Sequence, residues 1–339
     1  MRVLLTHNPE DLAAYFGRAL EDLQLVAGVE IVFNPLGREL ASTEELIEAA
    51  EGCQVIVAHR STAGEAALFQ SDRTTELCAF LRTAVDISTI DVDAATDAGV
   101  LVARASKAFV PSTAELALGL LLSVSRSIGI STADYHGGTE PPQRPGRQLR
   151  GQTAAVLGYG AIGSYLTELL LALGLEVVVH DPDERVLLPE KDGLRRATWD
   201  DALAQADVVF VLAPAEPATE NLSDGQALAQ MRHGAVLINV SRGELLDEAA
   251  VAAALDSGQL GGLGLDVGRA TDQRPSLSLA RRPDVVATPH LGGLTPENAD
   301  AQARSSVEQI EAMLAGSVPP RAVNADHARR LQAYWAANK

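Results

Sequence analysis

The stretch Ala-Ala-Val-Leu-Gly-Tyr-Gly-Ala-Ile-Gly-Ser, residues 154–164, sets the architecture of this chain. Four apolar residues lead into three spaced glycines, Gly158, Gly160 and Gly163, and residues 164–173 form an amphipathic pattern. A G-x-G-x-x-G motif between a strand and a helix is typical of a dinucleotide-binding unit. Its glycines permit a tight turn, a close approach of the backbone to a pyrophosphate, and close packing of the helix on the strand. A turn that only packs a helix on a strand, with nothing bound, is the alternative interpretation.

An acidic residue follows this motif at a suitable distance. Asp181 lies 18 residues after Gly163, at the end of the next apolar run, where a carboxylate can accept hydrogen bonds from both hydroxyls of a ribose. No arginine follows it immediately to bind a 2′-phosphate, although Arg185 is close enough in the sequence to leave NADP open. The sequence therefore favours NAD over NADP.

Short apolar runs alternate with helical patterns on both sides of this motif, which predicts an α/β fold with parallel sheets. The later part of the chain has predicted strands at 154–157, 177–180, 208–213, 236–240, 263–267 and 285–288, enough for a doubly wound sheet. The first hundred residues form a smaller α/β unit, with predicted strands at 3–6, 30–33, 55–58 and 100–102 and helices at 11–25 and 43–50. We also expect one long helix at 113–128, an extended arm at 137–151 and a helical tail from 296, broken at Pro319-Pro320. Residues 261–264, although glycine-rich, lead into a strand and are interpreted as a tight turn.

The composition excludes several classes of protein. The formal net charge is −18, from 27 basic and 45 acidic residues. This charge argues against a broad surface that binds nucleic acid or an anionic membrane. Two cysteines make neither a disulfide framework nor a zinc site. The N-terminus resembles a first core strand rather than a signal peptide, and no run reaches 18 apolar residues. We expect a soluble cytoplasmic protein.

Polar side chains follow three of the predicted strands. Arg242 lies in the block Asn-Val-Ser-Arg-Gly at 239–243, His290 lies in the block Thr-Pro-His-Leu-Gly-Gly at 288–293, and Asp266 ends the strand between them. Ligands of open α/β sheets bind at the carboxyl ends of the strands. An arginine can clamp a carboxylate with two hydrogen bonds, and a histidine can exchange a proton near neutral pH.

With the glycine motif and Asp181, these blocks resemble the D-isomer-specific 2-hydroxyacid dehydrogenase family, from about residue 55 to 324. The family includes phosphoglycerate dehydrogenases, glyoxylate/hydroxypyruvate reductases and D-lactate dehydrogenases. The resemblance implies two Rossmann-like or flavodoxin-like domains with an active cleft between them. Residues 1–102 and 294–339 would form a discontinuous catalytic domain, and residues 103–293 an NAD-binding domain with a dimer arm near 130–150. A homodimer that uses NAD and a small 2-hydroxy or 2-oxo acid is implied.

The resemblance also implies roles for single residues. Arg242 would bind the substrate carboxylate and polarise the 2-oxo group, and His290 would be the general acid–base for hydride transfer between nicotinamide C4 and substrate C2. No metal is required for such a transfer. Backbone N–H groups of Ala161 and Ile162 would contact the pyrophosphate. The residues expected to line the nicotinamide side are Pro214, Thr219, Val240 and Asp266. A turn or capping role for Asp266 is the alternative.

The chain departs from the family pattern in two places. Thr271 stands where the family has a Glu that pairs with the histidine, and we expect the neighbouring Asp272 to serve as its partner. The family's glycine-rich substrate loop aligns with residues 82–87, where Asp86 replaces a glycine. Ala84 and Val85 would still offer backbone N–H groups to the substrate carboxylate, and Arg60 with Arg82 would restore positive potential.

Two other functions stay open. An NAD(H)-binding redox sensor, similar to corepressors with this fold, would lack dehydrogenase activity, and the missing Glu favours it. A hydride donor such as formate or phosphite is the second alternative. The presence of both Arg242 and His290 favours a 2-hydroxyacid dehydrogenase, but the sequence does not identify its acid.

Overall fold

The computed structural model describes residues 1–338 and divides the chain into two compact units. Unit 1 consists of Met1–Ala108 and Pro296–Lys339, and unit 2 is Phe109–Thr295. The predicted boundaries, after residues 102 and 293, lie slightly earlier. The difference arises because strand β5 (Leu101–Arg104) still belongs to the sheet of unit 1.

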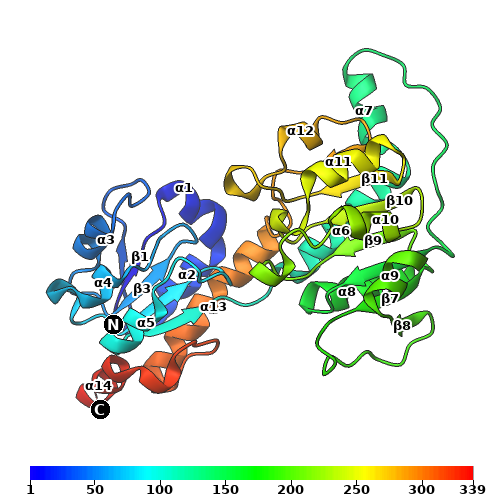
Figure 1. The fold of residues 1–339 in the computed structure, drawn as a ribbon. Helices are drawn as coiled ribbons and strands as arrows, with labels where there is room; N and C mark the ends of the chain where they lie inside the picture. The colour runs from blue at the N-terminus through cyan, green and yellow to red at the C-terminus, as the bar shows by residue number, and fades with distance from the viewer. Residues whose placement is uncertain (339) are drawn as a thin grey trace. The chain divides into compact units, whose positions relative to one another are not determined.

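Unit 1 is built on a parallel sheet of five strands in the order β2-β1-β3-β4-β5 (Figure 1). The other strands are β1 (Arg2–Leu5), β2 (Glu30–Phe33), β3 (Val55–Ala58) and β4 (Ala79–Arg82). The sequence prediction missed β4. This strand has only four residues, and it ends in an arginine that is itself fully buried, so its pattern did not resemble a core strand.

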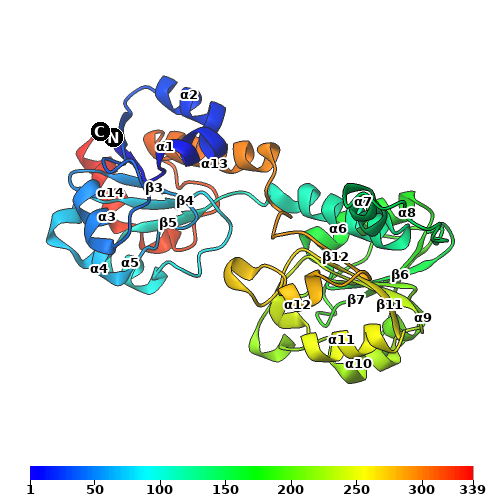
Figure 2. The ribbon, with the colours of Figure 1, turned by 90° about the horizontal axis from the view of Figure 1, so that it is seen from above.

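Helices cover both faces of this sheet, as Figure 2 shows from above. Alternate strand residues such as Leu5 and Leu4 point to opposite faces and enter separate apolar clusters. One face packs on α2 (Gly17–Leu25), α13 (Pro296–Leu314) and α14 (Arg329–Ala337), and the other on α3 (Thr43–Ala50), α4 (Ala66–Gln70) and α5 (Val92–Ala98). Helices α13 and α14, which follow unit 2 in the sequence, therefore contribute to the core of unit 1. The predicted helix at 11–25 is in fact interrupted: α1 (Pro9–Asp11) continues as a π-helical turn (Leu12–Phe16), and Gly17 has a φ of 42°.

Unit 2 contains a parallel sheet of seven strands in the order β12-β11-β10-β9-β6-β7-β8. The strands are β6 (Thr153–Leu157), β7 (Glu176–His180), β8 (Leu194–Arg196), β9 (Val208–Val211), β10 (Ala235–Asn239), β11 (Leu260–Leu265) and β12 (Val285–Ala287). The prediction missed the short, half-exposed edge strand β8. The expectation of a tight turn at 261–264 is wrong, because these residues lie inside β11. A Cβ atom on Gly262 would come within 2.5 Å of Val124, and one on Gly264 within 2.5 Å of Ile238, so the glycines here serve close packing.

One face of this sheet packs on α6 (Phe109–Ser125) and α8 (Ala161–Ala172). The opposite face packs on α9 (Trp199–Gln205), α10 (Gly225–Gln230), α11 (Glu248–Asp256) and α12 (Leu277–Ala280). The single helix predicted at 113–128 is wrong, because α6 ends at Ser125 and α7 (Ile128–His136) begins after Ser127, whose φ is 53°. Within residues 1–338 no single helix is long and apolar enough to cross a membrane; α6 and α7 reach that length only as a pair bent by 71°.

The segment that follows α7 runs along unit 2 without helix or strand, as predicted for the arm (Figure 1). It is held in two places: Arg144 forms an ion pair with Asp134 at 2.9 Å, and the backbone N–H of Arg147 donates to the carbonyl of Ser125 at 3.0 Å. A role of this arm in dimer formation stays a prediction.

Candidate active site

The glycine motif forms the turn between β6 and α8. Gly158 has a φ of 103°, and a Cβ atom on it would come within 2.9 Å of the Leu212 backbone. A Cβ atom on Gly163 would overlap the carbonyl oxygen of Gly158. Both positions therefore require glycine. Gly160, the N-cap of α8, has nothing within 4 Å of the place where its Cβ would lie, so the space in front of the helix is open.

The N-terminus of α8 is a suitable place for an anion. No side chain among residues 1–338 caps it, and the first turn of a helix has N–H groups without intrahelical acceptors. Ala161 and Ile162 belong to this turn. Free N–H groups and the positive end of the helix dipole favour a phosphate here. The residues present thus fit the pyrophosphate of a dinucleotide.

Asp181 lies just beyond β7 and is tied to the glycine turn. One carboxylate oxygen accepts from the backbone N–H of Tyr159 at 2.8 Å, and the other from the N–H of Asp183 at 2.9 Å. A carboxylate has further lone pairs with which it can accept from ribose hydroxyls. Arg185 is engaged elsewhere: its guanidinium binds Asp183 at 2.8 and 3.0 Å, and this bonding lowers the pKa of the Asp183 carboxyl.

The loop after β9 contains Pro214 and Thr219. The hydroxyl of Thr219 donates to the Pro214 carbonyl at 2.7 Å and accepts from the backbone N–H of Glu216 at 3.0 Å. Thr219 therefore closes this loop. Val240, which follows β10, is buried.

The loop that carries Arg242 is anchored by Asn239, which is fully buried. The Asn239 side chain donates to the Arg242 carbonyl at 2.7 Å and accepts from the Ser241 N–H at 3.0 Å. The Ser241 hydroxyl donates to the Ala213 carbonyl at 2.7 Å. Within residues 1–338 the Arg242 guanidinium donates only to the Ser241 carbonyl, at 2.8 Å, so most of its N–H groups stay available for an anion.

Asp266 holds the loop that carries His290. Its carboxylate is buried and accepts from the Thr288 hydroxyl at 2.6 Å and from the backbone N–H groups of Leu291 and Gly292, both at 2.7 Å. Its carbonyl accepts from the His290 N–H at 2.9 Å. The carboxylate is thus directed toward the 288–292 loop. His290 itself has a φ of 61°, a conformation that a non-glycine residue adopts only when its surroundings impose it.

The side chain of His290 bonds to Asp272, but not in the predicted way. Its Nδ1 lies 3.0 Å from the backbone carbonyl oxygen of Asp272, whereas the Asp272 carboxylate is exposed and lies 3.9 Å from the Arg274 guanidinium. Asp272 has φ 58° and ψ 32°, a left-handed conformation that turns its carbonyl toward the histidine. The partner of the imidazole is therefore a peptide oxygen rather than a carboxylate.

The Arg242 and His290 loops contact the same segment, residues 266–268, which follows β11. A Cβ atom on Gly243 would overlap the Gly268 backbone, so these two glycines are in direct contact. On the other side, the His290 N–H is bonded to Asp266. Both loops thus flank residues 266–268 at the carboxyl edge of the sheet.

The substrate-binding residues expected in unit 1 lie at the ends of β3 and β4. Arg60 is exposed, and Ala84 and Val85 are half-buried. Arg82 is fully buried and donates to the carbonyls of His59 at 2.8 Å and Arg60 at 2.6 Å. Burial lowers the pKa of Arg82 to about 10. Arg82 thus holds the backbone that carries Arg60, a role that the sequence did not indicate.

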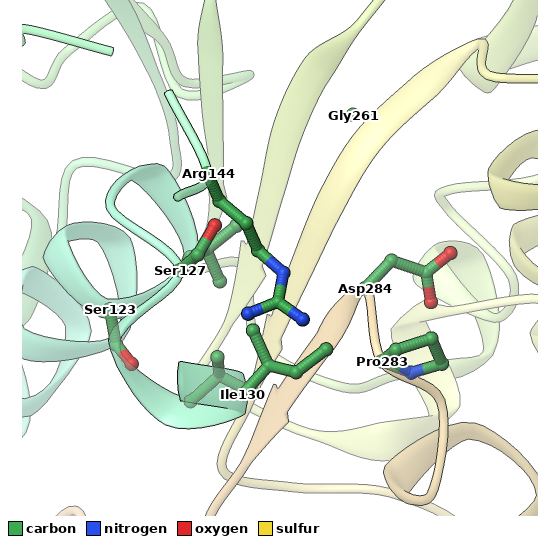
Figure 3. Close-up of a pocket in the computed structure, with 9 residues that line it drawn as sticks. Ser123, Ser127, Ile130, Arg144, Gly261, Pro283 and Asp284 are labelled. Carbon is green, nitrogen blue, oxygen red and sulfur yellow. The ribbon is translucent and has the colours of Figure 1, made fainter. Parts of the chain in front are cut away.

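A shallow pocket of about 270 Å³ lies elsewhere in unit 2 (Figure 3). Arg144 reaches across it between Ile130 and the Pro283-Asp284 pair, which immediately precedes β12. This is the amino edge of the sheet, opposite the edge that carries Arg242 and His290. The pocket is therefore separate from the candidate active site.

Comparison with known proteins identifies the family. The family model described as "D-isomer specific 2-hydroxyacid dehydrogenase, NAD binding domain" matches residues 118–292, more than half of the chain. The chain belongs to the D-isomer-specific 2-hydroxyacid dehydrogenase family. This confirms the predicted family, the fold class of two parallel α/β domains, and NAD as the cofactor class.

Named relatives agree with this family assignment. The D-3-phosphoglycerate dehydrogenase of Mycobacterium leprae is 37% identical over 246 residues, covering 72% of this chain and 46% of that relative. The hydroxypyruvate reductase of Thermotoga maritima is 30% identical over 275 residues, covering 79% of this chain and 86% of that relative. The chain thus spans about half the length of the phosphoglycerate dehydrogenases it matches. A solved structure from Thermus thermophilus is similar with a TM-score of 0.81 and 30% identity, covering 95% of this chain and all of that one.

Proposed function

We propose that this protein is an NAD(H)-dependent oxidoreductase that acts on a small 2-hydroxy or 2-oxo acid. The observation that carries the proposal is the packing of the Arg242 and His290 loops against one segment, residues 266–268, in the unit that contains the glycine turn. In this proposal the bound nicotinamide supplies or accepts the hydride. The protein binds the acid, stabilises charge and transfers the proton.

Arg242 is the proposed carboxylate-binding residue. Its planar guanidinium can form two parallel hydrogen bonds with a carboxylate, and it can polarise an adjacent 2-oxo group. Asn239 and Ser241 fix its backbone, which keeps the loss of conformational entropy on binding small. Lysine could replace the charge but not the forked geometry.

His290 is the proposed general acid–base. A carbonyl oxygen only accepts hydrogen bonds, so the contact with the Asp272 carbonyl requires the proton on Nδ1. Nε2 is then the nitrogen that exchanges a proton with the substrate oxygen: it donates during reduction and accepts during oxidation. Asp266 acts on this step as a positioning residue, because it holds the loop on which His290 lies.

We further propose NAD rather than NADP. Asp181 and Asp183 place two carboxylates beside the expected ribose position, and a 2′-phosphate there would meet like charge. Arg185 is already paired with Asp183 and does not offer a free cation to that phosphate. Binding of NADH at least tenfold tighter than NADPH, measured by the quenching of protein fluorescence, tests this proposal.

The remaining proposals extend the family resemblance. Arg60 binds the substrate together with the backbone N–H groups of Ala84 and Val85, which donate to its carboxylate, and the arm at 130–150 makes a homodimer. Gel filtration with light scattering tests the dimer. The KM for the 2-oxo acid in an NADH-oxidation assay tests substrate binding. A cytoplasmic location stays a prediction.

A panel of 2-oxo acids tests the activity. Purified protein should oxidise NADH with at least one of glyoxylate, hydroxypyruvate, pyruvate, 3-phosphohydroxypyruvate or a branched 2-oxo acid. The variants H290N and R242K should each reduce kcat/KM by about 100-fold or more, while the affinity for NADH changes less than threefold. The exposed His136→Asn serves as a matched control.

A redox-sensing binding protein is the second candidate function. The observation that favours it is the peptide carbonyl beside His290, which gives an imidazolium less stabilisation than a carboxylate would. Tight NADH binding with no turnover of any acid in the panel would support this function and contradict the first.

A further inference from the structure

Unit 1 has its own cluster of metal-ligating side chains, which the proposed reaction does not use. His59 directly follows β3, Asp11 ends α1, and Glu39 lies in the loop after β2. One ligand atom of each residue lies within 4.8 Å of the others. The chain thus brings together an imidazole and two carboxylates from three segments distant in sequence.

Hydrogen bonds define which nitrogen of His59 faces the carboxylates. Its Nδ1 lies 2.8 Å from the Ser61 hydroxyl, which donates its single proton to Glu39 at 3.0 Å. The backbone N–H of Ser61 donates to the same Nδ1 at 3.3 Å. Nε2 lies 3.9 Å from the Asp11 carboxylate and is therefore the ring nitrogen that faces this candidate ligand.

His7 adds an independent observation. It follows β1, is only 4% exposed, and neither of its ring nitrogens has a hydrogen-bond partner among residues 1–338. Its ring lies edge-on to that of His59, with centroids 5.2 Å apart. Buried polar groups without partners are rare, and a ligand that they bind is one explanation.

We propose that Asp11, Glu39 and His59 bind a divalent transition metal ion of the zinc type, with His7 as the fourth donor. Imidazole and carboxylate ligands suit Zn²⁺ and Co²⁺, whereas Mg²⁺ and Ca²⁺ select oxygen ligands alone. Ligands around a tetrahedral zinc ion lie about 3.4 Å apart, so the cluster needs only a small closure. Asn8 already orients Asp11, donating to its carboxylate at 2.8 Å.

Such an ion would join three separate segments of unit 1. It would also act on the candidate substrate loop, because the His59 carbonyl accepts from Arg82, the residue that holds the Arg60 backbone. The expected effects are a more stable unit 1 and a more rigid Arg60 loop. Neither depends on dehydrogenase activity.

Calorimetric titration of untagged, chelator-treated full-length protein with ZnCl₂ tests the proposal, and CoCl₂ serves as a spectroscopic probe. We expect one ion per chain, a visible Co²⁺ absorption typical of four-coordinate sites, and a Tm increase of about 5 to 10 °C at hundredfold excess over Kd. CaCl₂ and MgCl₂ should not bind at the same concentrations.

Variants identify the ligands. D11N and H59Q should each weaken Zn²⁺ binding at least tenfold, and E39Q provides a further test at an exposed position if H59Q does not fold. Glu10→Gln, adjacent to Asp11, and His136→Gln, an exposed histidine in unit 2, are matched controls that should bind like the wild type. Absence of binding at 100-fold molar excess, or affinity unchanged in both D11N and E39Q, would overturn the proposal.

Discussion

Asp272→Asn distinguishes the two ways in which this residue can act on His290. The structure assigns the contact to the peptide carbonyl, while the carboxylate is exposed and lies near Arg274. Asparagine removes the charge but tolerates the left-handed conformation of Asp272. We therefore expect the pH profile of kcat/KM to move by less than about 0.3 units, because a solvated charge directed elsewhere is screened.

Asp272→Val tests the backbone conformation of residue 272 rather than the charge of its side chain. A β-branched residue disfavours the left-handed conformation by about 1–2 kcal/mol, so the loop would leave the geometry that directs its carbonyl at Nδ1. A factor of about 5–30 in the population of the correct loop corresponds to that energy. We expect a decrease of similar size in kcat/KM, with little change in NADH affinity.

Two measurements check this reasoning. Initial rates between pH 5 and 9 give the apparent pKa of the acid–base group, and ¹⁵N NMR of the histidine side chains reports whether Nδ1 carries the proton even in the absence of turnover. A shift of one pH unit or more in D272N, together with a normal D272V, would refute the role of the carbonyl. It would show that the carboxylate reaches His290 in solution.

Three further predictions concern the fold and the cofactor site. Gly163→Ala should reduce NADH affinity more than tenfold and lower the Tm, because its Cβ would overlap the Gly158 carbonyl. Gly160→Ala should keep the wild-type Tm, because the place that its Cβ would occupy is open. Equal Tm values for the two variants would contradict this packing argument. Asp266→Asn directs an amide toward three hydrogen-bond donors and should destabilise unit 2 by about 3 kcal/mol. Scanning calorimetry should show this as a Tm lower by roughly 6 to 12 °C. A variant as stable as the wild type would mean that other contacts hold the 288–292 loop. Burial raises the pKa of the Cys78 thiol to about 11 from an ordinary value of 9.0. The contribution of the neutral thiol to the free energy of unfolding is therefore complete below pH 9, and about 2 kcal/mol of it is lost as the pH rises toward 11. Urea unfolding at pH 8 and pH 10.5 should show this loss in the wild type and a smaller loss in Cys78→Ala, and equal losses in the two proteins would contradict the prediction.

Much of this protein could be predicted from the sequence, because some residues have local causes for their positions. Gly163 packs against the Gly158 carbonyl within one strand–turn–helix unit, and Asp181 lies directly after the very next strand. Arg242 and His290 each lie three residues after an apolar strand, β10 or β12, and the carboxyl ends of parallel strands meet at one edge. Periodicity and spacing were sufficient there.

Tertiary structure alone determined the rest. Strand β4 ends in a buried arginine whose charge is compensated by carbonyls 22 and 23 positions earlier in the sequence, and no local pattern indicates that. The partner of His290 depends on the backbone conformation of Asp272, whereas the sequence only showed the type of its side chain. The cluster around His59 unites residues from three segments. In each case the deciding interaction joins groups distant along the chain, and only the folded backbone determines which of them meet.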